Sequence, residues 1–396
     1  MNSFLFFGET SCSKSLMNRA LIAQSYFPHL KIEKASKDEA LSKDILHLRN
    51  SLAAIQKFEN TFDCGEGGTT FRFLAIRVSR VPGKHLLKMH PRLRERPHSD
   101  LISLLDQLGV KSEFQGNALL IQSEGWRRPK KPLEISRKFS SQFASGLLLN
   151  AWNLDFEIPI FLSEESVSDD YFEMTMRFCR EMGMKVLEVG DQLTLLPHQK
   201  VLSATYDVEM DISSLFSLAT AAALDGELKT EEFPIRSLQP DSRFVEIFAK
   251  MNIPQYYSGH ILEIKKAEKI LPIKVNLNNC PDLFPVLSVL CAFADGVSEL
   301  SGASQLIYKE SDRIAKTAEL LKSVGIWTEA IEGGLRIFGG KPSLLSATRF
   351  NPDHDHRMAM AAGLLRLKGF PLIIENPEVV EKSFPLFWKT LGVSPC

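Results

Sequence analysis

The chain has 396 residues, too many for one typical hydrophobic core, so about two or three domains are expected. Its 47 lysines and arginines nearly balance its 48 aspartates and glutamates, which argues against a nucleic-acid-binding protein and makes any anion site local. No stretch approaches the roughly 18 consecutive apolar residues of a transmembrane helix, so no membrane partner is expected.

Cysteine usage and the first residues indicate a soluble cytoplasmic protein. The six cysteines are scattered without a CxxC pair, which predicts reduced thiols and neither a zinc cage nor a disulfide framework. Residues 1–7 lack the basic start of a signal peptide, and their apolar run Phe4–Phe7 predicts a strand instead.

The first helix is expected to open at Ser13-Lys14-Ser15. Lys14 then lies where free backbone N–H groups and the positive end of the helix dipole attract anions. Ser15 and Arg19 are four residues apart and share one face of this helix. The segment alone fits a phosphate or carboxylate site, and equally an ordinary capped helix with solvated charges.

The same arrangement, a polar or glycine-rich segment before an apolar helical run, recurs along the chain. With Ser13, Gly68, Ser140, Ser213, Asp282 and Asp355 as markers, subtraction gives intervals of 55, 72, 73, 69 and 73 residues. Such periodicity predicts six repeated supersecondary units. The six segments are Ser13–Ser15, Gly65–Thr70, Ser140–Gln142, Asp211–Ser214, Pro281-Asp282 and Asp353–Arg357.

A second marker has the same spacing. Helices end at an apolar residue plus Gly or Asn, and a β-hairpin with a Gly-containing turn follows. The four pairs of helix end and turn are Leu108-Gly109 with Gly116-Asn117, Met182-Gly183 with Gly190-Asp191, Met251-Asn252 with Gly259-His260, and Val324-Gly325 with Gly333-Gly334. Each unit therefore reads as two strands, two helices and a hairpin.

The sixth unit is cut short after Gly392, and the strand Phe4–Phe7 is expected to complete it. The N-terminus then belongs to the C-terminal half. The sequence predicts an α/β protein of two domains with three units each, residues 1–10 plus 208–396 and residues 11–207. A cleft between two such domains is a common place for a small-molecule site.

Seven segments also resemble the 5-enolpyruvylshikimate-3-phosphate (EPSP) synthase family, in the order the family has them. They are Ser13-Lys14-Ser15 with Arg19, Gly68-Thr69 with Arg72, Arg92–Pro97, Ser140-Ser141-Gln142, Lys309–Arg313, Asp355–Met360 and Lys382–Pro385. The resemblance implies two domains of three α/β units around an interdomain active site. It also implies transfer of the enolpyruvyl group of phosphoenolpyruvate (PEP) to the 5-hydroxyl of shikimate 3-phosphate, with release of phosphate.

The family match assigns residues to the two anionic substrates. Shikimate 3-phosphate is expected to contact Lys14, Ser15, Arg19, Ser140, Ser141, Gln142, Ser168, Asp282, Gln305 and Lys309. PEP is expected to contact Lys14, Gly68, Arg92, Gln142, Arg313, Arg357 and Lys382. Guanidinium groups suit both ligands because their planar forks bind carboxylate or phosphate bidentately. A monomer that needs no cofactor and no metal is expected.

The implied chemistry requires a base and an acid. Asp282 is the expected base for the 5-hydroxyl, Glu310 the acid that protonates the PEP methylene, and Lys14 a third catalytic group. Without the family match, Asp282 could be a helix N-cap and Glu310 could form a surface ion pair with Arg313. Residues 353–356 could likewise be read as a metal cluster.

Three departures from the family pattern bear on the substrates. Cys12 stands where Gly is usual, Gln305 replaces a substrate-binding Asn, and Glu66 stands where many members have Asn. A carboxylate facing PEP would repel it, so Glu66 is expected to pair with Arg72 or Arg94 or to turn outward.

Two alternatives therefore stay open. One is an enolpyruvyl transferase that uses another acceptor, such as the related UDP-N-acetylglucosamine enzyme, although residues 91–97 lack the loop cysteine of that enzyme. The other is a non-catalytic anion-binding homologue.

Overall fold

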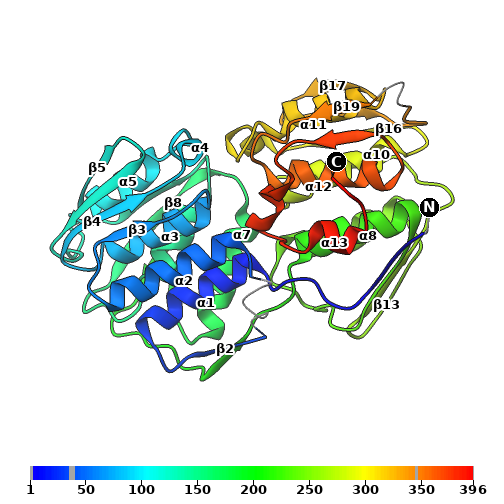
Figure 1. Ribbon diagram of the computed structural model, residues 1–396. Coiled ribbons are helices and arrows are strands. Elements are labelled where there is room, and N and C mark those ends of the chain that lie inside the picture. Colours follow the sequence, from blue (N-terminus) through cyan, green and yellow to red (C-terminus); the bar gives the residue numbers. More distant parts are fainter. Residues whose placement is uncertain (1–2, 35–40, 344–346, 396) are drawn as a thin grey trace. The chain divides into compact units, whose positions relative to one another are not determined.

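The structure is a computed structural model that describes residues 3–34, 41–343 and 347–395 (Figure 1). These residues form two compact groups, which we describe separately. Unit 1 contains residues 3–12, 41–42 and the described residues from Glu209 on, and unit 2 contains residues 13–34 and 43–208. The domain boundaries expected from the sequence stay predictions. Cys396 lies outside the described residues, whereas the other five cysteines are buried.

Unit 2 contains one two-stranded and two four-stranded sheets, with strand orders β11-β2, β3-β4-β6-β5 and β7-β8-β10-β9. The strands are β2 (Lys31–Glu33), β3 (Thr61–Asp63), β4 (Gly83–Lys88), β5 (Lys111–Gln115), β6 (Ala118–Ser123), β7 (Leu133–Arg137), β8 (Ile158–Ser166), β9 (Val186–Val189), β10 (Gln192–Leu195) and β11 (Thr205–Asp207). The helices are α1 (Lys14–Tyr26), α2 (Lys43–Gln56), α3 (Gly68–Val78), α4 (Pro91–Arg94), α5 (Ser99–Gln107), α6 (Gln142–Leu149) and α7 (Asp169–Glu181).

Unit 1 repeats this plan with sheets β1-β12-β14-β13, β15-β16-β18-β17 and β19-β20. The strands are β1 (Phe4–Phe7), β12 (Gly226–Thr230), β13 (Gln255–Ser258), β14 (Ile261–Lys265), β15 (Lys274–Asn276), β16 (Val297–Ser301), β17 (Trp327–Ile331), β18 (Gly334–Phe338), β19 (Thr348–Phe350) and β20 (Leu372–Ile374). The α-helices are α8 (Ile212–Asp225), α9 (Phe244–Lys250), α10 (Phe284–Ala292), α11 (Arg313–Ser323), α12 (His356–Leu367) and α13 (Phe387–Leu391). Short 3₁₀ helices are η2 (Pro240–Arg243), η3 (Pro281–Leu283), η4 (Ser304–Tyr308) and η5 (Pro377–Lys382).

The α/β class and the repeated units are confirmed. Four repeats follow one order of strand, helix, strand, second helix and hairpin, as in β3-α3-β4-α5-β5-β6. In three of them, the second, third and fifth, the first two strands pair in parallel. The sixth repeat lacks a hairpin, as expected. The first repeat also lacks one, because β3 follows almost directly after α2. This missing hairpin explains why the first interval is 55 residues, whereas the others are close to 70.

The expectation that Phe4–Phe7 completes the sixth unit is wrong. This strand, β1, pairs in parallel with β12 of the fourth repeat, from Phe4↔Gly226 to Phe7↔Lys229. The strand that precedes α8, β11, pairs with β2 in unit 2, so the sheet of the fourth repeat needs its first strand from elsewhere. The sixth repeat already has its own parallel pair, β19 and β20. The first and fourth repeats have therefore exchanged strands.

The four hairpins occur where the glycine turns predicted them, and one turn differs by a residue. Ile331 pairs with Gly334, so the link between β17 and β18 is Glu332-Gly333 and not Gly333-Gly334. Gly334 belongs to β18, where a Cβ would lie 1.8 Å from the carbonyl oxygen of Leu300 in the neighbouring strand. The second glycine thus permits a close approach between strands, and the first supplies the turn with its positive φ of 61°.

In each unit the first helix of every repeat lies at the centre. In unit 2, α1, α3 and α6 contact one another, and in unit 1, α8, α10 and α12 do so. Every residue of α10 is buried, as is nearly every residue of α8 and α12. These helices are apolar all round because they have no solvent-facing side. Their N-termini carry the polar segments that the sequence analysis selected.

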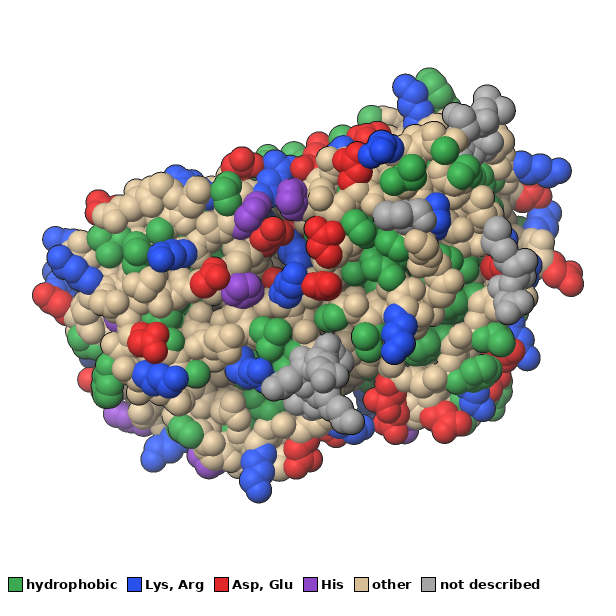
Figure 2. All heavy atoms as spheres, in the orientation of Figure 1, with side chains coloured by type: hydrophobic (Ala, Val, Ile, Leu, Met, Phe, Trp, Pro, Cys, Tyr) green, Lys and Arg blue, Asp and Glu red, His purple; other side chains and the backbone are tan. Residues whose placement is uncertain are grey.

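The surface fits the balanced composition. On the face drawn in Figure 2, lysines and arginines alternate with acidic side chains and form no continuous basic area. Within the described ranges, no helix combines the length and the apolar character needed to cross a bilayer.

Candidate active site

In unit 1, one buried arginine joins three carboxylates. The Arg313 side chain is 1% exposed, and its Nη1 donates to Asp282 at 2.8 Å. Its Nη2 donates to Glu310 at 2.9 Å, and its Nε donates to Asp355 at 2.7 Å. The pair of Glu310 and Arg313 is therefore not a surface ion pair. The structure thus brings together the two residues expected to act as base and acid, Asp282 and Glu310.

Asp282 faces three cations. Besides Arg313, its carboxylate lies 3.5 Å from Lys309 Nζ and 3.6 Å from Arg357 Nη2. Burial disfavours its ionised form, but Lys309, Arg313 and Arg357 outweigh burial and hold its pKa well below the usual range of an aspartate. Asp282 lies inside η3 and makes no cap of its own helix, so the N-cap interpretation is wrong.

Two further expected residues of unit 1, Gln305 and Lys382, are also buried. Lys382, the last residue of η5, is 6% exposed. Gln305 is 3% exposed, and its amide donates to the carbonyl oxygen of Asn278 at 2.8 Å.

Asp241 is a functional candidate that the sequence analysis missed. It is buried in η2 and accepts a hydrogen bond from the Ser213 hydroxyl. Burial and the negative charge of Asp282 raise its pKa to about 6. Like Asp282, it follows a proline at the start of a 3₁₀ helix, and this repeated Pro-Asp dipeptide is the signal that could have revealed it.

In unit 2, Lys14 begins α1, as expected, and Ser13 caps this helix by accepting from Leu16 N at 3.4 Å. Lys14 Nζ lies 2.9 Å from Asp44, a buried carboxylate that the sequence analysis did not select. Arg19 is 2% exposed.

The hydrogen bonds of Arg19 go to neutral oxygens, namely Thr175 Oγ1 and the carbonyls of Ser15 and Tyr171. Burial lowers the pKa of Arg19 to about 10, so its positive charge would be stabilised by a bound anion.

The N-termini of α3 and α6 are joined through Arg72. Its Nη1 donates to Gln142 Oε1 at 2.8 Å and to Ser140 Oγ at 3.2 Å, and Gln142 donates to Thr69 Oγ1 at 2.9 Å. Ser141 is 2% exposed, and Ser168 is buried just before α7 with a left-handed φ of 57°. The expected residues Gly68, Ser140 and Gln142 therefore lie together.

Residues 91–97, which we call the arginine loop, lie against the glycine turn 65–68. A Cβ built on Gly68 would be 2.6 Å from Arg96 Nη1, so the guanidinium of Arg96 covers Gly68. The expected PEP ligand Arg92 instead donates to Glu95 at 2.9 Å, and both side chains are more than a third exposed. Arg96 is thus a further candidate, which the sequence analysis included in the segment Arg92–Pro97 but did not assign to a substrate.

Glu66 lies 3.6 Å from His90 Nε2 at the junction of the glycine turn and the arginine loop. Arg94, one of its two expected partners, instead stacks on Phe114 with its Cζ 3.8 Å from the ring centroid. The expectation that Arg94 pairs with Glu66 is therefore wrong, because the guanidinium of Arg94 lies over the ring of Phe114.

The described residues contain no group of three His, Cys, Asp or Glu side chains placed to hold a metal ion. Within residues 353–356, the carboxylate of Asp355 is fully buried and accepts from Ser311, Arg313 and the backbone N–H of Arg357. These contacts occupy the oxygens that a metal would need, so the metal interpretation is not supported here.

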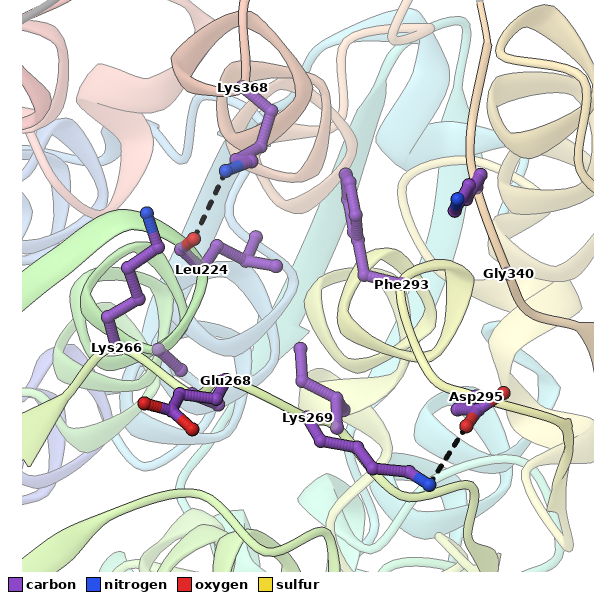
Figure 3. A pocket seen from close by; sticks show the side chains of 12 residues that line it. Leu224, Lys266, Glu268, Lys269, Phe293, Asp295, Gly340 and Lys368 are labelled. Atoms are coloured by element: carbon purple, nitrogen blue, oxygen red, sulfur yellow. Dashed lines mark hydrogen bonds and ion pairs between the residues drawn. The ribbon is translucent and has the colours of Figure 1, made fainter.

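A separate cavity of about 560 Å³ lies at the C-terminal ends of α8, α10 and α12 (Figure 3). Lys368 Nζ donates to the carbonyl oxygen of Leu224 at 3.2 Å, and Lys266 and Lys368 share Asp225. Lysines at helix C-termini stabilise the terminal carbonyls, which gives these side chains a structural explanation. The candidate residues lie at the opposite ends of the same helices.

Comparisons with known proteins agree on one family. The family model described as EPSP synthase (3-phosphoshikimate 1-carboxyvinyltransferase) matches residues 24–391. The 3-phosphoshikimate 1-carboxyvinyltransferase of Pyrococcus abyssi is 31% identical and covers 96% of this chain and 92% of its own length. The enzyme of the same name from Dehalococcoides mccartyi is 33% identical, over 83% of this chain and 77% of its own.

Solved structures share the fold. The EPSP synthase of Acinetobacter baumannii superimposes with a TM-score of 0.73 at 22% identity, over 98% of this chain and 95% of its own. The enolpyruvyl transferase NikO of Streptomyces tendae does so with a TM-score of 0.70 at 15% identity, over 99% and 94%.

Proposed function

Because the chain belongs to the EPSP synthase family, we propose that it transfers the enolpyruvyl group of PEP to the 5-hydroxyl of shikimate 3-phosphate and releases phosphate. This reaction is a step of the shikimate pathway, which leads to the aromatic amino acids. The observation that carries the proposal is the buried group of Asp282, Glu310 and Arg313, since it supplies two carboxylates and a cation in one place.

The reaction divides into addition and elimination. Asp282 takes the proton of the 5-hydroxyl while the hydroxyl oxygen attacks C2 of PEP. Glu310 protonates the methylene carbon of PEP in the same step. The resulting tetrahedral intermediate then returns a methyl proton to the Glu310 carboxylate and expels its phosphate, which takes up the proton held by Asp282. This elimination restores the C=C bond as an enol ether. Lys14, Arg357 and Lys382 stabilise the phosphate as it leaves.

The three cations around Asp282 make it a weak base before substrates bind, because they lower its pKa. Two polyanionic substrates would compete with Asp282 for Lys309 and Arg357. Loss of part of this cationic field raises the pKa of a carboxylate. We therefore propose that substrate binding itself makes Asp282 basic enough to act.

We propose that both substrates use the residues selected from the sequence. For shikimate 3-phosphate, Arg19 has the strongest support because it is a buried cation whose hydrogen bonds all go to neutral oxygens. For PEP, the covering of Gly68 by Arg96 supports adding Arg96 to the proposed ligands, whereas Arg92 has weaker support because Glu95 pairs with it. We also propose a monomer acting in the cytoplasm.

A phosphate-release assay tests the function. The purified protein is mixed with PEP and shikimate 3-phosphate together, with each substrate alone as the control. Release only in the presence of both is expected. Parallel reactions contain UDP-N-acetylglucosamine as acceptor, because NikO shows that this fold also serves another enolpyruvyl transferase. Release with PEP plus UDP-N-acetylglucosamine, but not with PEP plus shikimate 3-phosphate, would favour a different enolpyruvyl transfer. If no phosphate is released with either acceptor, an anion-binding homologue is favoured.

A further inference from the structure

We propose that Asp355 is a positioning residue: it anchors the guanidinium of Arg313, and Arg313 in turn holds Asp282 and Glu310 in place. The inference rests on the proposed function, because it concerns the two residues that act as base and acid. It adds a residue that touches neither substrate and acts only through Arg313.

The anchor is a buried bidentate ion pair. Asp355 is 0% exposed, and its Oδ2 accepts from Arg313 Nε at 2.7 Å while its Oδ1 accepts from Nη2 at 3.2 Å. The Ser311 hydroxyl donates to Oδ2 at 3.1 Å, and the backbone N–H of Arg357 donates to Oδ1 at 2.9 Å. Two parallel hydrogen bonds between planar groups fix the plane of the guanidinium as well as its position.

The remaining edge of the guanidinium is turned toward the catalytic pair. Nη1 donates to Asp282 Oδ1 at 2.8 Å, and Nη2 donates to Glu310 Oε2 at 2.9 Å. Because one rigid planar group binds both carboxylates, the separation of base and acid follows from where that group is held. These contacts leave Arg313 one N–H, on Nη1, for any further partner.

Asp355 also balances charge. Without it, the buried Arg313 would be shared only by Asp282 and Glu310, and it could move toward either carboxylate. A shift of about 1 Å in a reacting group is enough to cost up to ~10²-fold in rate. The third, fully buried carboxylate of Asp355 opposes this shift, because its two hydrogen bonds hold the other edge of Arg313 and it is itself fixed at the N-cap of α12.

The test compares two cap residues of neighbouring helices. Asp355→Asn keeps an oxygen that can cap α12 but removes the charge that holds Arg313. Asp312→Asn is the matched control, because Asp312 caps α11 by accepting from Ala315 N at 3.0 Å. For Asp355→Asn we expect kcat to fall about 10–100-fold, the loss typical of residues that orient a functional group, with both KM values within about threefold. For Asp312→Asn we expect kcat within about twofold of the parent.

A second readout does not need turnover. In ¹⁵N-arginine NMR spectra, the buried Nε–H of Arg313 should exchange slowly with solvent in the parent and at least tenfold faster in Asp355→Asn. If the parent releases no phosphate while this contrast in exchange is seen, the proposed function fails but the anchor stands.

Two results would overturn the proposal. One is an Asp355→Asn variant with the kcat of the parent. The other is a loss confined to the KM for PEP with kcat unchanged, because Arg313 would then serve PEP binding without positioning Asp282 and Glu310. If Asp355→Asn does not fold, Ser311→Ala decides, because it removes only the hydroxyl that orients Asp355 Oδ2. A roughly 3–10-fold lower kcat supports the anchor, and an unchanged kcat contradicts it.

Discussion

Replacing Gly68 by alanine should weaken PEP binding without harming the fold. The new Cβ would lie 2.6 Å from Arg96 Nη1 and 3.1 Å from its Cζ. Ordinary contacts of a Cβ begin near 3.4 Å, so the guanidinium must retreat by at least 0.8 Å, the difference between 3.4 and 2.6. Gly68 does not have a left-handed φ, so alanine can adopt its backbone conformation.

The prediction is specific because Gly68→Ala should weaken PEP binding without lowering the free energy of unfolding. Alanine is favoured over glycine within a helix by about 0.5–1 kcal/mol, so the free energy of unfolding should rise or stay unchanged. A displacement near 1 Å of a positioning cation can cost up to ~10²-fold, and because Arg96 is flexible we expect the KM for PEP to rise roughly 3–30-fold. The family resemblance implies that glyphosate occupies the PEP site and is bulkier than PEP, so its inhibition constant should rise more.

Steady-state kinetics with shikimate 3-phosphate saturating, together with urea denaturation, measure both effects. Gly340→Ala is the control, since a Cβ there meets no atom within 4 Å and the backbone is not left-handed. If Arg96 mediates the effect, adding Gly68→Ala to Arg96→Gln should cost little more than Arg96→Gln alone. Unchanged PEP and glyphosate constants in a folded Gly68→Ala variant would show that this contact does not shape the PEP site.

Asp282→Ala should lower kcat roughly 10²–10⁴-fold while shikimate 3-phosphate still binds in calorimetry, and near-normal kcat would remove Asp282 from the mechanism. His98 is neutral in the folded protein at pH 7, because burial lowers its pKa to about 4 and the positive charge of Arg72 adds to this effect. Since unfolding lets His98 titrate at its usual value near 6.5, stability should fall by about 3 kcal/mol as pH drops from 7 to below 4, and His98→Gln should lose that part of the acid sensitivity in urea melts. Lys14→Gln leaves the buried carboxylate of Asp44 without this partner and should cost about 1–3 kcal/mol, and adding Asp44→Asn should restore stability but not turnover. Glu66→Asn should leave the KM for PEP unchanged or slightly lower, and turnover seen only in the variant would contradict the proposed function.

Local patterns in the sequence determined the repeats and the ends of the helices. Hydrophobic periodicity, caps such as Ser13 and glycine turns such as Gly116-Asn117 involve residues close together in the chain. The helix N-termini that carry Lys14, Gly68 and Gln142 were predicted for this reason. Even Glu332-Gly333 was missed by only one residue, because either glycine of the pair could have supplied the turn.

Tertiary structure decided which strands pair and which charges meet. Nothing in Phe4–Phe7 distinguishes β12 from β20 as a partner, because backbone hydrogen bonds are the same for every strand. The choice follows from the pairing of β11 with β2, two strands that lie 174 residues apart in the chain, as the registered pair Thr205↔Lys31 shows. The partners of Arg313 are set in the same way, since Asp282, Glu310 and Asp355 come from three segments and only packing brings their oxygens to one guanidinium. Sequence patterns reveal relations between residues that are close along the chain. A buried charge must be paired with opposite charges, and these can come from any part of the chain that the fold brings near.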